Sequence, residues 1–302
     1  MTFRTDHKMM NLPWFESPFF KDILQAANLD AETAKLVLHY ADNGYNIIDL
    51  GIEDIDATAE RIIRDLAPKY PQGNRRVMDA WYFQEDVRKI ASSKMVMNIL
   101  KILYGREPIP FQTLNFDVGT QQCAHSDTLH FHSVPRHYMC GVWAALEDID
   151  SDNGPLFYYP GSHKLPDFNM NDIGLPSSYD YYQKYEAFIE ALALSQGFEK
   201  KELYIKKGQA LIWTANLLHG GSPIRDKKRT RHSQVTHYYF LDCMYYMPME
   251  SDPFIGKMCM REVINITTGK IVPHYYKGVE VKLSEFDKVW RYPRPLPAFV
   301  SE

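Results

Sequence analysis

The spacing of apolar and polar positions divides the chain into a helical first third and a strand-rich remainder. Apolar residues recur every three or four positions in three early segments, which predicts helices over 30–42, 57–66 and 85–104. Asp30 is an N-cap residue type at the start of the first helix, and Gly44 ends that helix. A strand is expected over 45–52. The Pro- and aromatic-rich segment 11–20 is expected to be an irregular arm.

From residue 109 onward, short apolar runs separated by Gly, Pro and Asn predict strands over 111–117, 139–146, 154–159, 203–205, 209–213 and 234–241. Such a pattern is typical of a β-barrel or sandwich, so the expected fold class is mainly β with flanking helices. Residues 166–201 interrupt the strands and contain a predicted helix over 179–194. Insertions of this kind commonly cover a barrel mouth. A hairpin over 260–275 and an irregular tail with Pro293, Pro295 and Pro297 complete the chain.

Length and composition favour one domain over the whole chain. The 302 residues are 45% hydrophobic, enough to bury a sizeable core, and they contain neither a repeat nor a linker-like stretch. We therefore expect a single domain over 1–302. It divides into a helical part (1–108), a barrel core (109–245, with the insertion 166–201) and a C-terminal hairpin and tail (246–302).

The net charge of −4 gives no reason to expect nucleic acid or an anionic membrane surface as a partner. The longest apolar run, 138–146, is too short to cross a bilayer, and residues 1–12 lack the apolar core of a signal peptide. The four cysteines lack metal-site spacing, so reduced thiols are expected. These features predict a cytoplasmic protein that acts on a small-molecule substrate without inserting into a membrane. They leave its oligomeric state open.

The candidate chemistry is concentrated at His125-Ser126-Asp127. Side chains two apart on an extended strand point to the same side, so this pair offers an imidazole and a carboxylate together. His219, which follows the strand-like run 210–213, is the best candidate for a third ligand. Two His and one carboxylate are the ligand set of non-haem Fe(II) oxygenases. A His-x-Asp pair alone is more often a hydrogen-bonded surface pair.

The neighbouring motifs favour the metal site. After Asp127 come a strand centred on Trp143, an Asp-x-x-x-x-Asn-Gly motif ending at Gly154, the sequence Pro-Gly-Ser-His ending at His163, and finally His219-Gly220. In this order of motifs, between about 112 and 240, the chain resembles the phytanoyl-CoA dioxygenase family of Fe(II)/2-oxoglutarate oxygenases. The resemblance implies a double-stranded β-helix (a cupin-like jelly roll) that uses Fe(II), 2-oxoglutarate and O2. It also implies that His125, Asp127 and His219 are the metal ligands and catalytic residues.

The same resemblance implies that Arg231 holds the far carboxylate of 2-oxoglutarate. A planar guanidinium suits a carboxylate, and Ser233 on the same strand face adds a hydroxyl. The other cations of this stretch are read as a solvated charge run: Arg225, Lys227, Lys228 and Arg229. Trp143, 18 positions after His125, takes the family's place beside the cosubstrate, or else it is a core tryptophan. Gln112 and Asn115 are further candidates to bind the keto acid, although amides commonly line barrels.

His130, His132 and His137 follow the metal motif in a loop that is expected to shape the substrate mouth. They are candidates for substrate contact, with loop packing as the alternative. Related iron halogenases replace the acidic ligand by a small residue, so Asp127 favours hydroxylation or another oxidation over halogenation. The expected reaction oxidises an unactivated C–H bond of a small or medium organic metabolite and releases succinate and CO2. A cupin-type metalloenzyme without 2-oxoglutarate and a non-catalytic binding protein remain as alternatives.

Overall fold

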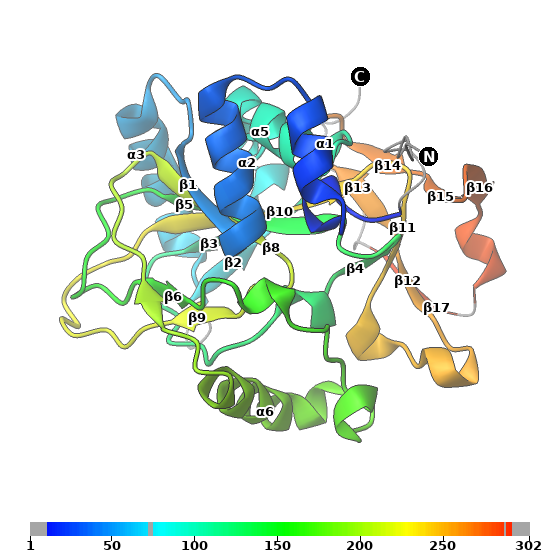
Figure 1. Cartoon of the computed structure of the whole chain (residues 1–302). Coiled ribbons are helices and arrows are strands. Elements are labelled where there is room, and N and C mark those ends of the chain that lie inside the picture. The colour runs from blue at the N-terminus through cyan, green and yellow to red at the C-terminus, as the bar shows by residue number, and fades with distance from the viewer. Residues whose placement is uncertain (1–10, 72–74, 287, 292–302) are drawn as a thin grey trace.

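The central element is a six-stranded antiparallel sheet in the order β1-β8-β5-β10-β3-β2 (Figure 1). The computed structural model describes residues 11–71, 75–286 and 288–291. The bounds of these strands are Tyr45–Asp49 (β1), Arg76–Met78 (β2), Pro108–Phe116 (β3), Met139–Ala145 (β5), Gln209–Thr214 (β8) and Ser233–Phe240 (β10). Antiparallel pairing brings segments far apart in sequence into one surface, and β10 lies between β5 and β3.

A smaller sheet faces this one in the order β7-β6-β9, with bounds Lys201–Glu202, Leu156–Tyr158 and His219–Gly221. Buried apolar side chains of both sheets form a shared core, among them Trp143, Leu156, Tyr158, Leu211 and Trp213. A mainly β fold with flanking helices is therefore confirmed, and neither sheet closes into a barrel.

Five helices lie on the opposite side of the large sheet from the small sheet (Figure 1): α1 (Phe20–Ala26), α2 (Ala31–Asn43), α3 (Ile55–Leu66), α4 (Glu85–Ala91) and α5 (Lys94–Tyr104). The two predicted ends of α2 are confirmed. The Asp30 carboxylate accepts hydrogen bonds from the backbone N–H groups of Glu32 and Thr33, and Gly44 takes the left-handed conformation (φ 80°) that favours glycine.

The single helix predicted over 85–104 is wrong, because α4 ends at Ala91 and α5 begins at Lys94. The break is at Ser92 and Ser93. The Ser93 hydroxyl accepts a hydrogen bond from the Val96 N–H, as an N-cap does, and donates one to the Leu50 carbonyl oxygen. Serine side chains compete with the helix for backbone groups, which the apolar periodicity does not reveal.

Three other expected elements need correction. The arm over 11–20 contains a 3₁₀ turn (Trp14–Glu16) and leads into α1. Only Leu156–Tyr158 of the strand expected over 154–159 is regular, and the strand expected over 203–205 is displaced to Lys201–Glu202. Lys201–Glu202 is an edge strand of the small sheet, where few neighbours constrain the pairing, and Leu156–Tyr158 is its short middle strand.

The C-terminal part adds a third sheet in the order β17-β12-β11-β4 and two hairpins. Their strands are Lys288–Trp290 (β17), Cys259–Arg261 (β12), Met244–Tyr246 (β11), His132–Val134 (β4), Val263–Asn265 (β13), Lys270–Val272 (β14), His274–Tyr276 (β15) and Val279–Val281 (β16). The expected hairpin is confirmed for β13 and β14 around Thr268 and Gly269, while β12 belongs to the sheet and β15 to the second hairpin. The predicted irregular tail at Pro293, Pro295 and Pro297 lies outside the described residues.

The insertion 166–201 contains the expected helix as α6 (Tyr182–Ser195), beyond the small sheet (Figure 1). One apolar cluster joins residues from Phe15 in the N-terminal part to Val272 in the hairpin β13–β14. That continuity supports the single-domain organisation, which stays a prediction. All four cysteines are free thiols.

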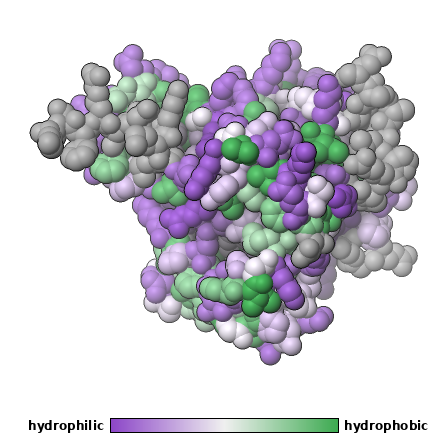
Figure 2. Space-filling model, turned by 90° about the vertical axis from the view of Figure 1, so that its right-hand side faces the viewer, coloured by the Kyte–Doolittle hydropathy of each residue, from purple (hydrophilic) through white to green (hydrophobic). Residues whose placement is uncertain are grey.

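Within the described ranges, no helix combines the length and apolar character needed to cross a membrane. Figure 2 shows the face beside β15 and β16, where hydrophilic side chains are interspersed with small hydrophobic groups.

Candidate metal centre and cosubstrate pocket

Three predicted ligand residues converge between the two facing sheets. The Nε2 atoms of His125 and His219 lie 4.0 and 3.9 Å from the two carboxylate oxygens of Asp127, and all three side chains are buried. His125 and His219 are brought together by a backbone bridge in which each N–H donates to the other's carbonyl oxygen. One nitrogen or oxygen from each residue lies within 4.8 Å of the others, which is an arrangement that can hold a metal ion.

Backbone carbonyl oxygens fix the orientation of both imidazole rings through their Nδ1 atoms. Nδ1 of His125 lies 3.0 Å from the Cys123 carbonyl oxygen, and Nδ1 of His219 lies 2.9 Å from that of Leu217. A carbonyl oxygen only accepts, so each Nδ1 carries the proton and donates it. Each Nε2 therefore presents a lone pair toward Asp127, as a ligating histidine does.

The protonation states also suit metal binding. Burial, reinforced by neighbouring His219, lowers the pKa of His125 to about 3, which keeps this imidazole neutral. Burial opposes ionisation of Asp127, but His219, His237 and the Trp213 N–H together hold the pKa of this carboxyl below its usual value. His125 thus offers a neutral nitrogen and Asp127 an anionic oxygen, the forms that bind a cation.

The triad opens into a cavity of about 470 Å³, within the size range of small-molecule sites. Its wall includes Gln112, Trp143 and Arg231, three of the predicted cosubstrate residues. The cavity therefore joins the metal ligands to the predicted cosubstrate contacts.

Arg231 lies two residues before β10 and is 1% exposed. Its Nη1 donates to the Gly154 carbonyl oxygen at 3.0 Å, and its guanidinium carbon lies 5.4 Å from the ring centre of Trp143. Burial lowers the pKa of Arg231 to about 10, so it remains charged at neutral pH. Its Nε and the hydroxyl of Ser233 are buried without a hydrogen-bond partner among the described residues. A bound carboxylate would satisfy such donors.

The two predicted amides behave differently. Gln112 lines the cavity, and its Oε1 lies 3.1 Å from Nδ1 of His237. Asn115 does not line the cavity. Its Nδ2 donates to Oε1 of Gln234 at 3.4 Å, and Gln234 in turn donates to the Val87 carbonyl oxygen of α4. An odd separation along a strand places side chains on opposite faces, so Asn115 points toward the helices.

Of the three loop histidines, only His130 lines the cavity. It lies 3.3 and 3.2 Å from the hydroxyls of Tyr179 and Tyr182, so the insertion packs against the cavity wall here. Burial lowers the pKa of His130 to about 4.

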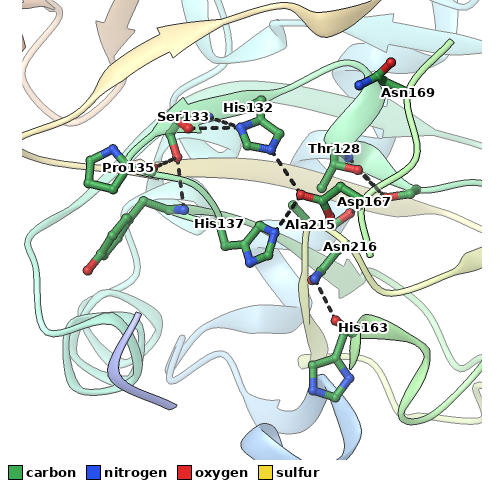
Figure 3. A network of polar contacts seen from close by, with 12 residues as sticks. Thr128, His132, Ser133, Pro135, His137, His163, Asp167, Asn169, Ala215 and Asn216 are labelled. Carbon is green, nitrogen blue, oxygen red and sulfur yellow. Dashed lines mark hydrogen bonds and ion pairs between the residues drawn. The ribbon is translucent and has the colours of Figure 1, made fainter. Parts of the chain in front are cut away.

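His132 and His137 form a separate cluster, which corrects their expected place at the substrate mouth. Their rings converge on Asp167 (Figure 3), with Nε2 atoms 3.2 and 2.7 Å from its Oδ2. His137 also bonds Glu16 through Nδ1 at 2.5 Å. These four side chains tie the N-terminal segment, the loop and the start of the insertion together, which favours the packing alternative for His132 and His137.

Two residues of the site were not predicted. Trp213 donates from its indole Nε1 to Oδ2 of Asp127 at 2.9 Å, and Nε2 of His237 lies 3.9 Å from the same oxygen. His237 lies an even number of positions after Arg231 and Ser233, so the three side chains are expected on the same face of an extended strand. This spacing was the sequence feature that could have revealed His237. A Cβ atom added at Gly141 would lie 2.2 Å from the Trp213 ring, so glycine is required where this indole crosses β5.

Solved structures with this arrangement of sheets show the fold class to be the jelly roll. The non-heme alpha ketoglutarate dependent carbocyclase SnoK from nogalamycin biosynthesis superposes with a TM-score of 0.59 at 16% identity, covering 73% of this chain and 88% of that one. EctD from S. alaskensis, solved with 2-oxoglutarate and 5-hydroxyectoine, gives 0.53 at 19% identity over 70% of this chain and 77% of its own.

The chain belongs to the phytanoyl-CoA dioxygenase (PhyH) family, whose family model matches residues 20–233. Among curated relatives, it is 32% identical over 80 residues to the Danio rerio phytanoyl-CoA dioxygenase domain-containing protein 1 (25% of this chain and 28% of the relative). It is 26% identical over 172 residues to the peroxisomal phytanoyl-CoA dioxygenase of Rattus norvegicus (56% and 45%). The chain thus spans less than half the length of these two relatives.

Proposed function

We propose that the protein is an Fe(II)- and 2-oxoglutarate-dependent dioxygenase that hydroxylates or otherwise oxidises a C–H bond of a small or medium organic metabolite. The observation that carries this proposal is the convergence of His125, Asp127 and His219 on one cavity that also contains the buried Arg231. Membership of the family supports it. When bound, iron with 2-oxoglutarate supplies the activation of O2.

The protein's own residues supply binding, orientation and protection from water. His125, Asp127 and His219 would hold the metal ion at the wall of the cavity. Arg231, with Ser233, would bind the distal carboxylate of 2-oxoglutarate beside Trp143. Gln112 and His237 line the cavity, and Nε2 of His237 lies 3.9 Å from Asp127, so both side chains would contact molecules bound there.

Two observations disfavour the alternatives. A cupin-type metalloenzyme without 2-oxoglutarate has no use for a dicarboxylate clamp, yet Arg231 is buried in the cavity wall, and its Nε has no partner in the part of the chain that the structure describes. A non-catalytic binding protein has no need for an intact ligand triad whose imidazoles are oriented by backbone carbonyl oxygens. Related solved structures carry the expected groups: SnoN is described with Fe3+ and alpha ketoglutarate.

The decisive experiment is an anaerobic titration of the apoprotein with Fe(II) and then 2-oxoglutarate, followed by visible absorption. We expect a weak metal-to-ligand charge-transfer band that is absent from His219→Ala at any concentration. In Arg231→Ala the band should require far more 2-oxoglutarate. Arg225→Ala is the matched control, because Arg225 is 60% exposed and lies outside the cavity wall. Iron binding without a band would favour the cupin alternative, and absence of iron binding would refute the metal site.

The proposal also includes a small-molecule partner and a single domain over residues 1–302. The cytoplasmic location is part of it too, and the alternative is a peroxisomal location, which two relatives have in their names. Cell fractionation of the tagged protein distinguishes the two locations.

A further inference from the structure

A second group of possible metal ligands lies outside the cavity of the proposed iron site. His132, His137 and Asp167 each offer one nitrogen or oxygen atom within 4.8 Å of the others, and none of the three lines that cavity. They come from β4, from the loop after it and from the start of the insertion. Figure 3 shows both imidazole rings turned toward the Asp167 carboxylate. The proposed oxidation uses none of these side chains.

The distances between these atoms suit a small divalent cation. Nε2 of His132 and Nε2 of His137 lie 3.2 and 2.7 Å from Oδ2 of Asp167. Zinc holds nitrogen and oxygen ligands at about 2.0–2.2 Å in tetrahedral geometry, which places neighbouring ligand atoms about 3.3–3.6 Å apart. The His132 nitrogen already lies nearly that far from the carboxylate, and the His137 ring would move back by roughly 0.6 Å. A cation between the three atoms therefore requires only a small adjustment.

Both histidines have an acceptor at Nδ1, as ligating histidines usually do. Nδ1 of His137 lies 2.5 Å from a carboxylate oxygen of Glu16, and Nδ1 of His132 lies 2.9 Å from the Ser133 carbonyl oxygen. An Nδ1–H that donates to such an oxygen leaves the lone pair of Nε2 for a metal ion. The Ser133 nitrogen also lies 2.9 Å from Nδ1 of His132, so the backbone of this residue can support either tautomer of the ring.

Two oxygen atoms of the cluster indicate that a binding partner is missing. Oδ1 of Asp167 and Oε1 of Glu16 are buried and have no hydrogen-bond partner in the described part of the chain. Buried polar atoms are nearly always paired with protein groups or with water. Oδ1 belongs to the carboxylate whose other oxygen faces the two imidazoles, so a cation bound between the rings could use both oxygens of Asp167.

The charges of the cluster also match a divalent cation. Asp167 and Glu16 supply two carboxylates, and His137 lies between them with one ring nitrogen facing each. In the metal-free protein both nitrogens of this ring must carry a proton to bond both carboxylates. A metal ion at Nε2 would replace one of these protons and supply the positive charge beside Asp167.

The cluster is partly buried but open to an ion from solution. The side chains of His132 and His137 are each 12% exposed, and that of Asp167 is 23% exposed. Solvent access of this kind provides a path for entry. It also allows water to complete the coordination of an ion that takes three ligands from the protein.

A metal ion at this place would join three segments that are distant in sequence. Glu16 ends the 3₁₀ turn before α1, His132 begins β4, and Asp167 precedes α6 in the insertion. The loop before β4 carries His130 and the insertion carries Tyr182, and both of these side chains line the cavity. The ion would therefore brace two segments that together form one wall of the cavity.

We propose that His132, His137 and Asp167 form a second metal site, which binds one Zn(II) or a similar divalent transition-metal ion in a structural role. Glu16 acts as a positioning residue that orients His137. Two imidazoles and one carboxylate suit zinc better than magnesium or calcium, which prefer oxygen ligands throughout. The second site shares no ligand with the proposed iron site, so it is independent of the proposed function.

The test counts the zinc ions that bind tightly to the untagged full chain after treatment with a chelator. Zn(II) is titrated in competition with a chromophoric chelator. We expect two equivalents for the wild type, because the ligands of the proposed iron site accept zinc as well. His219→Ala should retain one equivalent, because the two ligands left at that site hold zinc far more weakly. No tight Zn(II) binding to His219→Ala would overturn the proposal.

Further variants in the His219→Ala background assign the remaining ion to the cluster. Asp167→Asn and His132→Gln should each abolish tight binding. Glu16→Gln keeps all three ligands and should weaken it by about 10–100-fold, as the loss of a group that orients a ligand does. Asp180→Asn is the matched control, because Asp180 is an exposed carboxylate of the same insertion outside the cluster, and it should change nothing.

A thermal melt guards against variants that fail to fold. Zn(II) should raise the unfolding midpoint of His219→Ala and of its Asp180→Asn derivative, but not that of the Asp167→Asn derivative, whose metal-free melt shows whether it is folded. Zinc binding that survives both Asp167→Asn and His132→Gln would place the ion elsewhere and overturn the proposal. The charge-transfer band with Fe(II) and 2-oxoglutarate should persist in Asp167→Asn alone, so loss of the second site is distinguishable from failure of the proposed function.

Discussion

The indole Nε1–H of Trp213 donates to Oδ2 of Asp127 at 2.9 Å, which ties the carboxylate ligand to the middle of the large sheet. The hydrogen bond leaves the other carboxylate oxygen, Oδ1, on the side of His125. Trp213 would therefore affect a bound metal ion only by orienting Asp127, and we call it a positioning residue for that reason.

Replacing Trp213 by phenylalanine should weaken metal binding. The loss of a hydrogen bond to a ligand typically costs 10–100-fold in affinity, so we expect a decrease of about that size. Calorimetric titration with Mn(II) measures it without turnover. Trp81→Phe is the matched control, because Trp81 is fully buried but stacks on Tyr82, away from the cavity wall. An unchanged Mn(II) affinity in Trp213→Phe would show that the hydrogen bond does not position Asp127.

Gly141→Ala should destabilise the fold through the same tryptophan. The new Cβ would lie 2.2 Å from the indole ring, and overpacking of a core typically costs about 1–3 kcal/mol. Urea denaturation gives the free energy of unfolding. The double variant Gly141→Ala/Trp213→Phe should lose less than the sum of the two single variants, because the smaller ring leaves room for the methyl group. Strict additivity would mean that the two residues do not conflict.

The metal ligands were predictable because their indications are local. His125 and Asp127 are two apart, and His219 follows a strand within a recognisable order of motifs. The assignment of Asn115 was avoidable, since it and Gln112 are three apart on one strand and an odd separation cannot place both in the cavity. The structure retains that alternation and adds a bulge only beyond Gln112.

Other parts of the site depend on tertiary contacts that the sequence does not encode locally. Trp213 reaches Asp127 only because β8 pairs with β5 at a glycine. The pairing of His132 and His137 with Asp167 requires the insertion to fold back against the loop. Arg261 lines the cavity because it lies on β12 of the third sheet. β12 pairs in parallel with β17, and no tight turn joins the two strands to fix the register between them.

Arg231→Lys should raise the KM for 2-oxoglutarate and leave metal affinity unchanged. A lysine keeps the charge but loses the planar fork, and hydrogen bonds to a charged group contribute about 1.5–3 kcal/mol, so an increase of at least about tenfold is expected. Succinate release at varied 2-oxoglutarate measures KM, and Mn(II) calorimetry measures the metal. Arg225→Lys is the control on an exposed arginine. A normal KM in Arg231→Lys would assign the clamp elsewhere.

The cluster around His137 should make stability depend on pH on the alkaline side. Burial would lower the pKa of His137, but hydrogen bonds to Asp167 and Glu16 raise it to about 9. Because the folded pKa exceeds the unfolded value of about 6.5, the stabilisation is complete below about pH 6.5 and is lost as pH rises toward 9. At about 1.4 kcal/mol per pH unit, it amounts to roughly 3 kcal/mol when fully present.

Urea denaturation of wild type and His137→Gln between pH 6 and 9.5 measures this effect. The difference in free energy of unfolding should be largest at the acidic end and shrink as pH rises, because deprotonation removes in the wild type what the substitution removes at every pH. His39→Gln is the control, since the contacts of His39 among the described residues are with Tyr45 and Asn46, not with a carboxylate. A difference that stays constant across the range would mean that His137 is neutral in the folded protein. Because a neutral imidazole has only one N–H, only one of the contacts with Glu16 and Asp167 would then be a hydrogen bond to a carboxylate.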